Sequence, residues 1–183
     1  MTNTSKRIGV AAALLAGGLA GVASAQSWDG AYIGAALGGS NGDYNHADTL
    51  GNFNSGNGQV FAGYNYSMGK MVMGGEVATV LGNITTTDAG NYIRNLTDLK
   101  FRFGTTFGSA LVYASLGYSV GGSTSDGFNY DFNGVNYGIG MDYAVNDRIF
   151  VGAEIVARNI DDGLGYLDTR PMTTASVRAG FRF

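Results

Sequence analysis

The sequence predicts an all-β fold: a closed eight-stranded antiparallel up-and-down transmembrane β-barrel, preceded by a cleavable signal peptide. Three observations predict this fold. The chain begins with a short apolar leader, eight later segments alternate between apolar and polar residues, and the connections between those segments alternate between long and short. The 183 residues include 31 glycines, one proline and no cysteine, so a disulfide framework and a thiolate metal site are both excluded.

Residues 1–25 have the three parts of a secretory signal peptide. After a basic start, residues 8–22 form an apolar stretch, and Ala23 and Ala25 supply an A-x-A cleavage site. An N-terminal membrane helix is the disfavoured alternative, because the stretch is short and rich in Gly and Ala for a span of about 20 residues. Cleavage would leave 183 − 25 = 158 residues, so we expect residues 26–183 to form a single outer-membrane β-barrel domain.

Eight segments of the predicted mature chain alternate with the period of two that is typical of strands. In chain order they cover residues 31–38, 58–66, 71–81, 97–107, 110–120, 135–145, 149–158 and 173–183. Long connections rich in Gly, Asn, Asp, Ser and Thr occupy residues 39–57, 82–96, 121–134 and 159–172. The remaining links are short. Alternation of long and short connections is typical of membrane barrels, whose two ends face different compartments.

The two faces of each predicted strand differ in chemistry. One is apolar with aromatic residues, and the other mixes glycine with charge. A soluble barrel would place its apolar face inside, whereas a membrane barrel turns it toward lipid. We therefore expect Arg178 in the last segment to point into the barrel, and its neighbours Val177 and Ala179 to point out. Tyr and Phe residues near the strand ends would form the aromatic girdles.

Charged residues on the inward face fall at similar depths. When residues are counted from the short links, five charged residues fall at a common level: Glu76, Arg102, Asp142, Glu154 and Arg178. Two more, Lys100 and Arg158, lie further toward the long connections. Buried charges are costly unless they are paired. We therefore predict that these seven residues form an interior charge network. Its simplest role is to fill and stiffen the barrel, and the alternative is a constriction in a small pore.

The sequence predicts no catalytic residue, no cofactor and no metal site. The only histidine, His46, falls in a polar connection, and no Ser-His-acid set accompanies it. Asp161, Asp162 and Asp168 offer oxygen ligands, but their spacing matches no defined calcium loop. A formal net charge of −3 without a basic run argues against nucleic acid. We expect a protein that is not an enzyme.

The chain resembles the small eight-stranded outer-membrane barrels of the OmpA-type transmembrane domain and the related porin-like, opacity-like proteins of Gram-negative bacteria. The matching stretches, in order, are "YIGAALGGS", "GGEVAT", "FRFGTTF", "GMDYAVNDRIFVGAEI", "DTRP" and "ASVRAGFRF". The resemblance implies an outer-membrane location and folding by the barrel assembly machinery, for which Phe181 and Phe183 would form the C-terminal signal. It also implies an interior acid–base pair, which Glu76 and Arg102 match.

Taken together, these features predict an integral outer-membrane protein with a structural role in envelope integrity and with surface-exposed loops. Two alternatives stay open: a narrow, low-conductance porin-like channel for ions or small solutes, and adhesion or host-surface contact through the outer loops. We expect outer-membrane lipid and lipopolysaccharide as partners, with the barrel assembly machinery during biogenesis and no nucleic acid. We also expect a monomer, with both termini in the periplasm.

Overall fold

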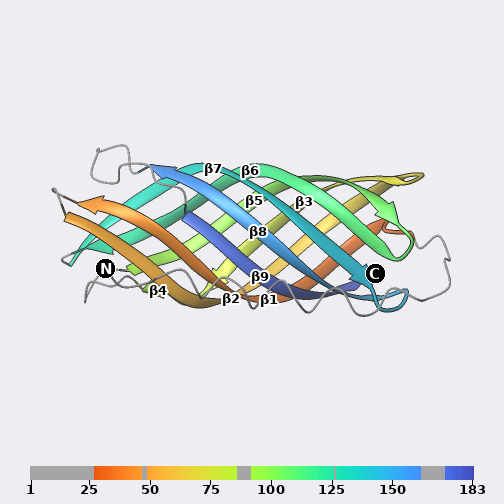
Figure 1. Cartoon of the computed structure of the whole chain (residues 1–183), viewed down its shortest axis with the longest axis horizontal. Helices are drawn as coiled ribbons and strands as arrows, with labels where there is room; N and C mark the ends of the chain where they lie inside the picture. The colour runs from red at the N-terminus through yellow and green to blue at the C-terminus, as the bar shows by residue number, and fades with distance from the viewer. Residues whose placement is uncertain (1–26, 47–48, 86–91, 126, 162–171) are drawn as a thin grey trace, which may run out of the picture.

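A computed structural model describes residues 27–46, 49–85, 92–125, 127–161 and 172–183. Within them the chain forms antiparallel strands that close into one barrel, with strands strongly tilted to its long axis (Figure 1). The strands are β1 (Gly30–His46), β2 (Thr49–Met68), β3 (Met71–Leu81), β4 (Ile84–Thr85), β5 (Tyr92–Phe107), β6 (Ala110–Ser125), β7 (Phe128–Ala144), β8 (Ile149–Asp161) and β9 (Met172–Arg182). In the described ranges, no helix has the length and apolar character needed to cross a membrane.

Backbone pairing closes the barrel, because it joins the first strand to the last and joins the two strands on either side of the short β4. β1 pairs with β9 as well as with β2, and β3 pairs directly with β5. The two-residue β4 pairs with β5 alone, so the wall consists of eight long strands. The last strand is fully engaged at its end, where the Phe183 amide donates to the Ala31 carbonyl at 3.0 Å. The predicted closed eight-stranded antiparallel barrel is confirmed.

The two ends of the barrel differ in their connections. At the short-turn end, β2–β3 and β5–β6 are joined by two-residue turns that begin with Gly69 (φ 65°) and Gly108 (φ 59°). A positive φ at this turn position matches the twist of paired strands and favours glycine. The opposite end is called the loop end below.

The prediction of long connections at residues 39–57 and 121–134 is wrong, because most of these residues lie in strands. β1 and β2 stay paired as far as His46 and Thr49, and β6 and β7 stay paired to their last residues. Gly, Asn and Ser have low strand propensity, but an aligned neighbouring strand can extend backbone pairing through them. His46 therefore ends a strand instead of lying in a loop, and the described part does not include its side chain.

Apolar side chains cover the outside of the barrel, as the alternation predicts. Leu37 is 70% exposed and Ile139 is 65% exposed, whereas the inward-facing Arg178 is 4% exposed. Two apolar clusters lie inside. The short-turn cluster consists of Trp28, Tyr32, Ala36, Phe61, Val72, Ala78, Leu111, Tyr113, Ala144 and Phe150. The loop-end cluster consists of Val80, Ile84, Ile93, Leu96, Phe132, Ile160 and Met172.

Polar residues occupy the interior between the two clusters. Along β8, for example, the inward positions run from Phe150 at the short-turn end through Glu154 and Arg158 to Ile160. All four side chains are buried. Along β8 the charged side chains therefore lie between apolar side chains at the two ends.

Glycine on one strand faces a large interior side chain on the next. The paired residues are Gly63 with Tyr32, Gly34 with Phe61, Gly140 with Tyr113, Gly180 with Phe150, and Gly152 with Asp142. A Cβ built at Gly180 would overlap the Phe150 ring, and one built at Gly140 would overlap the Tyr113 ring. Inward glycines therefore provide the space that the interior side chains fill.

Replacement of Gly180 should destabilise the barrel through overpacking. We expect Gly180→Ala to lower the free energy of unfolding by about 1–3 kcal/mol, because its methyl group would displace Phe150 inside a filled lumen. Urea unfolding in lipid vesicles measures this. Gly75→Ala is the matched control, since Gly75 is exposed on the outside and a Cβ there meets nothing within 4 Å. Equal effects of the two variants would contradict the packing argument.

Candidate functional site

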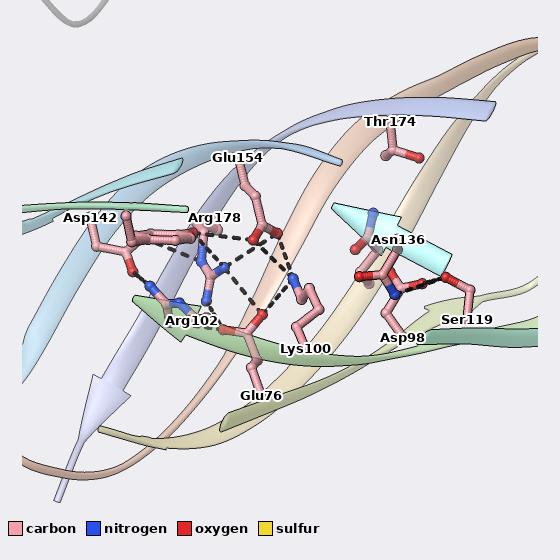
Figure 2. Close-up of polar contacts among 12 residues, drawn as sticks. Glu76, Asp98, Lys100, Arg102, Ser119, Asn136, Asp142, Glu154, Thr174 and Arg178 are labelled. Atoms are coloured by element: carbon pink, nitrogen blue, oxygen red, sulfur yellow. Dashed lines mark hydrogen bonds and ion pairs between the residues drawn. The ribbon is translucent and has the colours of Figure 1, made fainter. Parts of the chain in front are cut away.

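The most distinctive feature of the interior is a layer of three acids and three bases, drawn in Figure 2. This charged layer consists of Glu76 (β3), Lys100 and Arg102 (β5), Asp142 (β7), Glu154 (β8) and Arg178 (β9). Each residue is between 1% and 5% exposed. Five of the eight wall strands contribute, so the layer ties the barrel together across its lumen.

Glu76 is the centre of the charged layer. One carboxylate oxygen, Oε2, accepts hydrogen bonds from Arg102 Nη1 at 3.0 Å, from the Tyr32 hydroxyl at 2.9 Å and from Arg178 Nη2. The other, Oε1, lies 2.7 Å from Lys100 Nζ. Lys100 is directly opposite Glu76 in the β3–β5 register, whereas Arg178 reaches it from β9.

The other two acids complete the layer. Lys100 Nζ lies 2.7 Å from Glu154 Oε2, and Arg102 Nη2 lies 2.6 Å from Asp142 Oδ2. Arg178 approaches both, at 3.5 Å from Glu154 and 3.4 Å from Asp142. Each base thus contacts at least two acids. Three negative and three positive formal charges balance, and buried charges need this kind of mutual pairing.

Interior aromatic rings contact the guanidinium groups of Arg102 and Arg178. The Arg102 Cζ atom lies 3.7 Å from the centre of the Tyr113 ring, and the Arg178 Cζ atom lies 3.9 Å from the centre of the Phe61 ring. Desolvated cation–π contacts of this kind are stabilising. The Tyr113 hydroxyl also accepts from Arg178 Nη1 at 3.0 Å and donates to Glu154 at 3.3 Å. The arginines therefore have little freedom to change partners.

A second polar group lies toward the loop end, on the other side of Figure 2. Arg158 donates from Nε to Asp98 Oδ1 at 2.9 Å, and its Nη2 binds the second oxygen of the same carboxylate. Its Nη1 donates to the Thr174 hydroxyl at 2.7 Å. This polar layer consists of Ser40, Asn57, Gln59, Asp98, Ser119, Asn136, Arg158 and Thr174.

The structure therefore separates two residues that the sequence analysis placed together. Lys100 belongs to the charged layer and not above it, whereas Arg158 pairs with Asp98 in a layer of its own. Asp98 is absent from the predicted network. Its inward phase, two residues before Lys100 on the same strand, is the signal that could have included it. Tyr32 and Tyr113 are also absent from the predicted network. A tyrosine whose hydroxyl bonds to buried charges cannot be told from any other tyrosine in a sequence.

The remaining predicted site residues lie elsewhere. Phe181 and Phe183 are outside the barrel at the short-turn end, with ring centroids 5.3 Å apart. Ala23 and Ala25, with the whole predicted signal peptide, fall outside the described residues, as do Asp162 and Asp168. Within the part of the chain that is described, no three His, Cys, Asp or Glu side chains are grouped so that they could hold a metal ion.

A closed eight-stranded barrel that is apolar outside and charged inside is the arrangement of small outer-membrane proteins. The family described as outer membrane protein beta-barrel domain matches residues 10–183. The chain belongs to this family. Membership implies an outer-membrane location. No curated protein matches the sequence significantly.

Two bacterial proteins of known structure have the same fold. Neisserial surface protein A is 10% identical, with a TM-score of 0.55 over 84% of this chain and 97% of that chain. The attachment invasion locus protein Ail of Yersinia pestis, solved with the heparin analogue sucrose octasulfate, is 14% identical, with a TM-score of 0.53 over 84% of this chain and 99% of that chain. At these identities the similarity establishes the fold alone.

Proposed function

We propose that this protein is a structural component of the outer membrane, a barrel that spans the bilayer with a closed interior and supports envelope integrity. The observation that carries the proposal is the charged layer. Its six side chains are at most 5% exposed, their formal charges cancel, and apolar clusters lie between them and both ends of the barrel. A side chain that lines a water-filled channel would be exposed to water.

The outer face supports placement across the membrane. Aliphatic and aromatic side chains are exposed around the barrel, and Tyr66, Phe107 and Phe183 are 57%, 66% and 74% exposed at the short-turn end. Aromatic residues at this position suit the interface of a bilayer. We place the short-turn end and both termini in the periplasm, because short turns face the periplasm in bacterial barrels. The leader would direct export.

The proposal also states which partners the protein contacts and that it catalyses no reaction. The outer face would contact membrane lipid and lipopolysaccharide, and the barrel assembly machinery would recognise the last strand through Phe181 and Phe183. The protein acts as a monomer, without a cofactor and without binding nucleic acid. It is not an enzyme. The buried polar groups favour this, because hydroxyls bond to carboxylates inside the barrel, as Tyr113 does to Glu154 and Ser119 to Asp98, away from any surface that a substrate could reach.

Planar-bilayer recording tests the closed interior against the narrow channel. We expect the purified protein to show no steady conductance, and we expect Glu76→Gln and Arg102→Gln to open none, because apolar clusters still close both ends. Single-channel steps whose ion selectivity changes in both variants would establish a pore and overturn the structural role.

Deletion of the protein should make the envelope leaky to dyes and detergents.

Contact through the loop end is a second candidate, favoured by the length of two hairpins. β1 and β2 have 17 and 20 residues, and β6 and β7 have 16 and 17. A tilted strand needs about 9–11 residues to cross a bilayer. If the barrel spans the membrane, the paired strands of both hairpins extend beyond the bilayer, where a partner could reach them.

The net charge of the four segments that were predicted as long connections indicates which kind of partner they favour. Residues 39–57, 82–96, 121–134 and 159–172 contain eight Asp and two Arg, a formal balance of 8 − 2 = 6 negative charges. A net negative charge in these segments would repel sulfated polyanions of the kind bound to Ail and would favour cationic partners. Transfer of these four segments to an unrelated small barrel should transfer binding to a cationic surface, weakened by salt. Binding to heparin instead would contradict this assignment.

A further inference from the structure

The segment before β1 enters the barrel instead of continuing the strand. Trp28 is 1% exposed, and its ring meets Phe150 edge to face, with centroids 6.0 Å apart. Gly30, the first residue of β1, has a φ of 111°. This backbone conformation favours glycine and lets the chain bend from the wall toward the lumen. Residues 27–29 thus lie across the short-turn end.

Arg182 near the C-terminus holds this segment in place. Its guanidinium lies over the Trp28 ring, with Cζ 4.6 Å from the centroid. Nη1 donates to the Ser27 carbonyl at 2.7 Å, and Nη2 donates to the Asn146 carbonyl at 3.0 Å. One side chain therefore joins the N-terminal segment, the last strand and the β7–β8 turn.

A second attachment lies on the opposite side of the segment. The Asp29 carboxylate accepts a hydrogen bond from the backbone amide of Ser67, close to the β2–β3 turn. Residues 27–29 have no strand pairing of their own. The segment is held by Arg182, by the bond between Asp29 and Ser67, and by the contact of Trp28 with Phe150, and release of these contacts would break no strand pair.

Beyond Trp28, a short series of contacts leads to the charged layer. Phe150 packs against Tyr32 with ring centroids 5.9 Å apart, and the Tyr32 hydroxyl donates to Glu76. Tyr32 is directly opposite Arg182 in the β1–β9 register. Arg182 therefore reaches Trp28 only where β1 and β9 are paired, which couples the position of Trp28 to closure of the barrel.

We propose that residues 27–29 are a latched plug: Trp28 closes the short-turn end of the lumen once β1 and β9 have paired, and Arg182 is the latch. The plug opens by local release while the barrel stays folded. Glu76 is also held by ion pairs with Lys100, Arg102 and Arg178, so the plug and the structural role proposed above are separable.

A buried cysteine reporter tests the plug, since the chain contains no cysteine of its own. Ala144→Cys places a thiol in the short-turn cluster, where Ala144 is 4% exposed. With this reporter, Arg182→Gln should raise the rate of modification by a charged thiol reagent by about 30-fold, because loss of a desolvated cation–π contact shifts a local opening equilibrium by this order. Trp28→Ala should raise the rate at least as much.

Two further cysteine variants show whether a change in the modification rate comes from the plug or from the whole barrel. Lys70→Cys, at an exposed turn, should react rapidly in every background. Val80→Cys lies in the loop-end cluster, where Val80 is 7% exposed, and should stay slow in every background. A parallel rise at Val80→Cys would mean that the whole barrel loosens, which would overturn the proposal. An unchanged rate at Ala144→Cys after Trp28→Ala would overturn it as well.

Fluorescence gives an independent readout, because Trp28 is the only tryptophan of the chain. We expect its emission to be blue-shifted and protected from acrylamide in the folded barrel. Arg182→Gln and Gly30→Val should each shift the emission to the red while the barrel keeps its heat-modifiable gel mobility. Emission of a water-exposed tryptophan in the unaltered folded barrel would show that there is no plug.

Discussion

Neutralisation of Glu76 should produce the largest loss of stability of any single substitution in the barrel interior. Glu76→Gln leaves three bases facing two acids in a layer that is almost fully buried. Removing one partner from a buried ion pair costs about 3–5 kcal/mol, because the remaining charge is left without compensation. We expect a decrease of this size in the free energy of unfolding, measured by urea denaturation in lipid vesicles.

Two variants control this experiment. Arg94→Gln removes a charge from the pair with Asp131, which is 3.9 Å long and has an exposed carboxylate, and should cost less than about 1 kcal/mol. Lys100→Met in the Glu76→Gln background restores the charge balance and should recover part of the loss. If Glu76→Gln costs no more than Arg94→Gln, the charged layer does not hold the barrel together.

A charge on the outer face should be nearly as costly if that face lies in hydrocarbon. Leu116 lies midway along the wall on β6, is 61% exposed, and is flanked across the strands by Phe101 and Tyr137. Arginine at the midplane of a membrane barrel costs about 2–4 kcal/mol, whereas the same change on a water-exposed surface costs little. We therefore expect Leu116→Arg to lower the free energy of unfolding in lipid by this amount.

The position of the substitution provides the control. Phe107, at the short-turn end of β5, is 66% exposed, so Phe107→Arg makes a similar chemical change near the proposed interface. Its cost should fall to about 0–1 kcal/mol, since the arginine reaches water and lipid headgroups there. Equal and small costs at both sites would place the outer face in water and contradict the transmembrane assignment.

The direction of each side chain could be predicted from local pattern alone. In a strand, successive side chains point to opposite faces, so the alternation around Arg178 is enough to turn it inward and Val177 outward. The same reasoning predicts which residues are exposed on β5 and β6. Strand length could not be predicted in this way, because pairing of β1 with β2 as far as His46 depends on the aligned neighbour and not on side-chain polarity.

Partners across the lumen required the closed barrel. Asp98 on β5 and Arg158 on β8 are separated by two intervening strands, yet Arg158 binds both oxygens of the Asp98 carboxylate. Counting residues from the turns gives the depth of each side chain along its own strand. The tilt of the strands decides which side chains of different strands lie at the same height in the lumen. This is why Lys100 lies within the charged layer although its position in the sequence suggested a place above it.

The sequence by itself determined the strand alternation, the inward direction of the predicted charged residues and the barrel class, because each follows from a period of two that is visible in any short stretch. Only the tertiary structure decided that three acids and three bases form one balanced layer, that Asp98 and Arg158 form another, and that Trp28 enters the lumen beneath Arg182. These contacts join residues up to 155 positions apart. They depend on closure and stagger, which no local pattern contains.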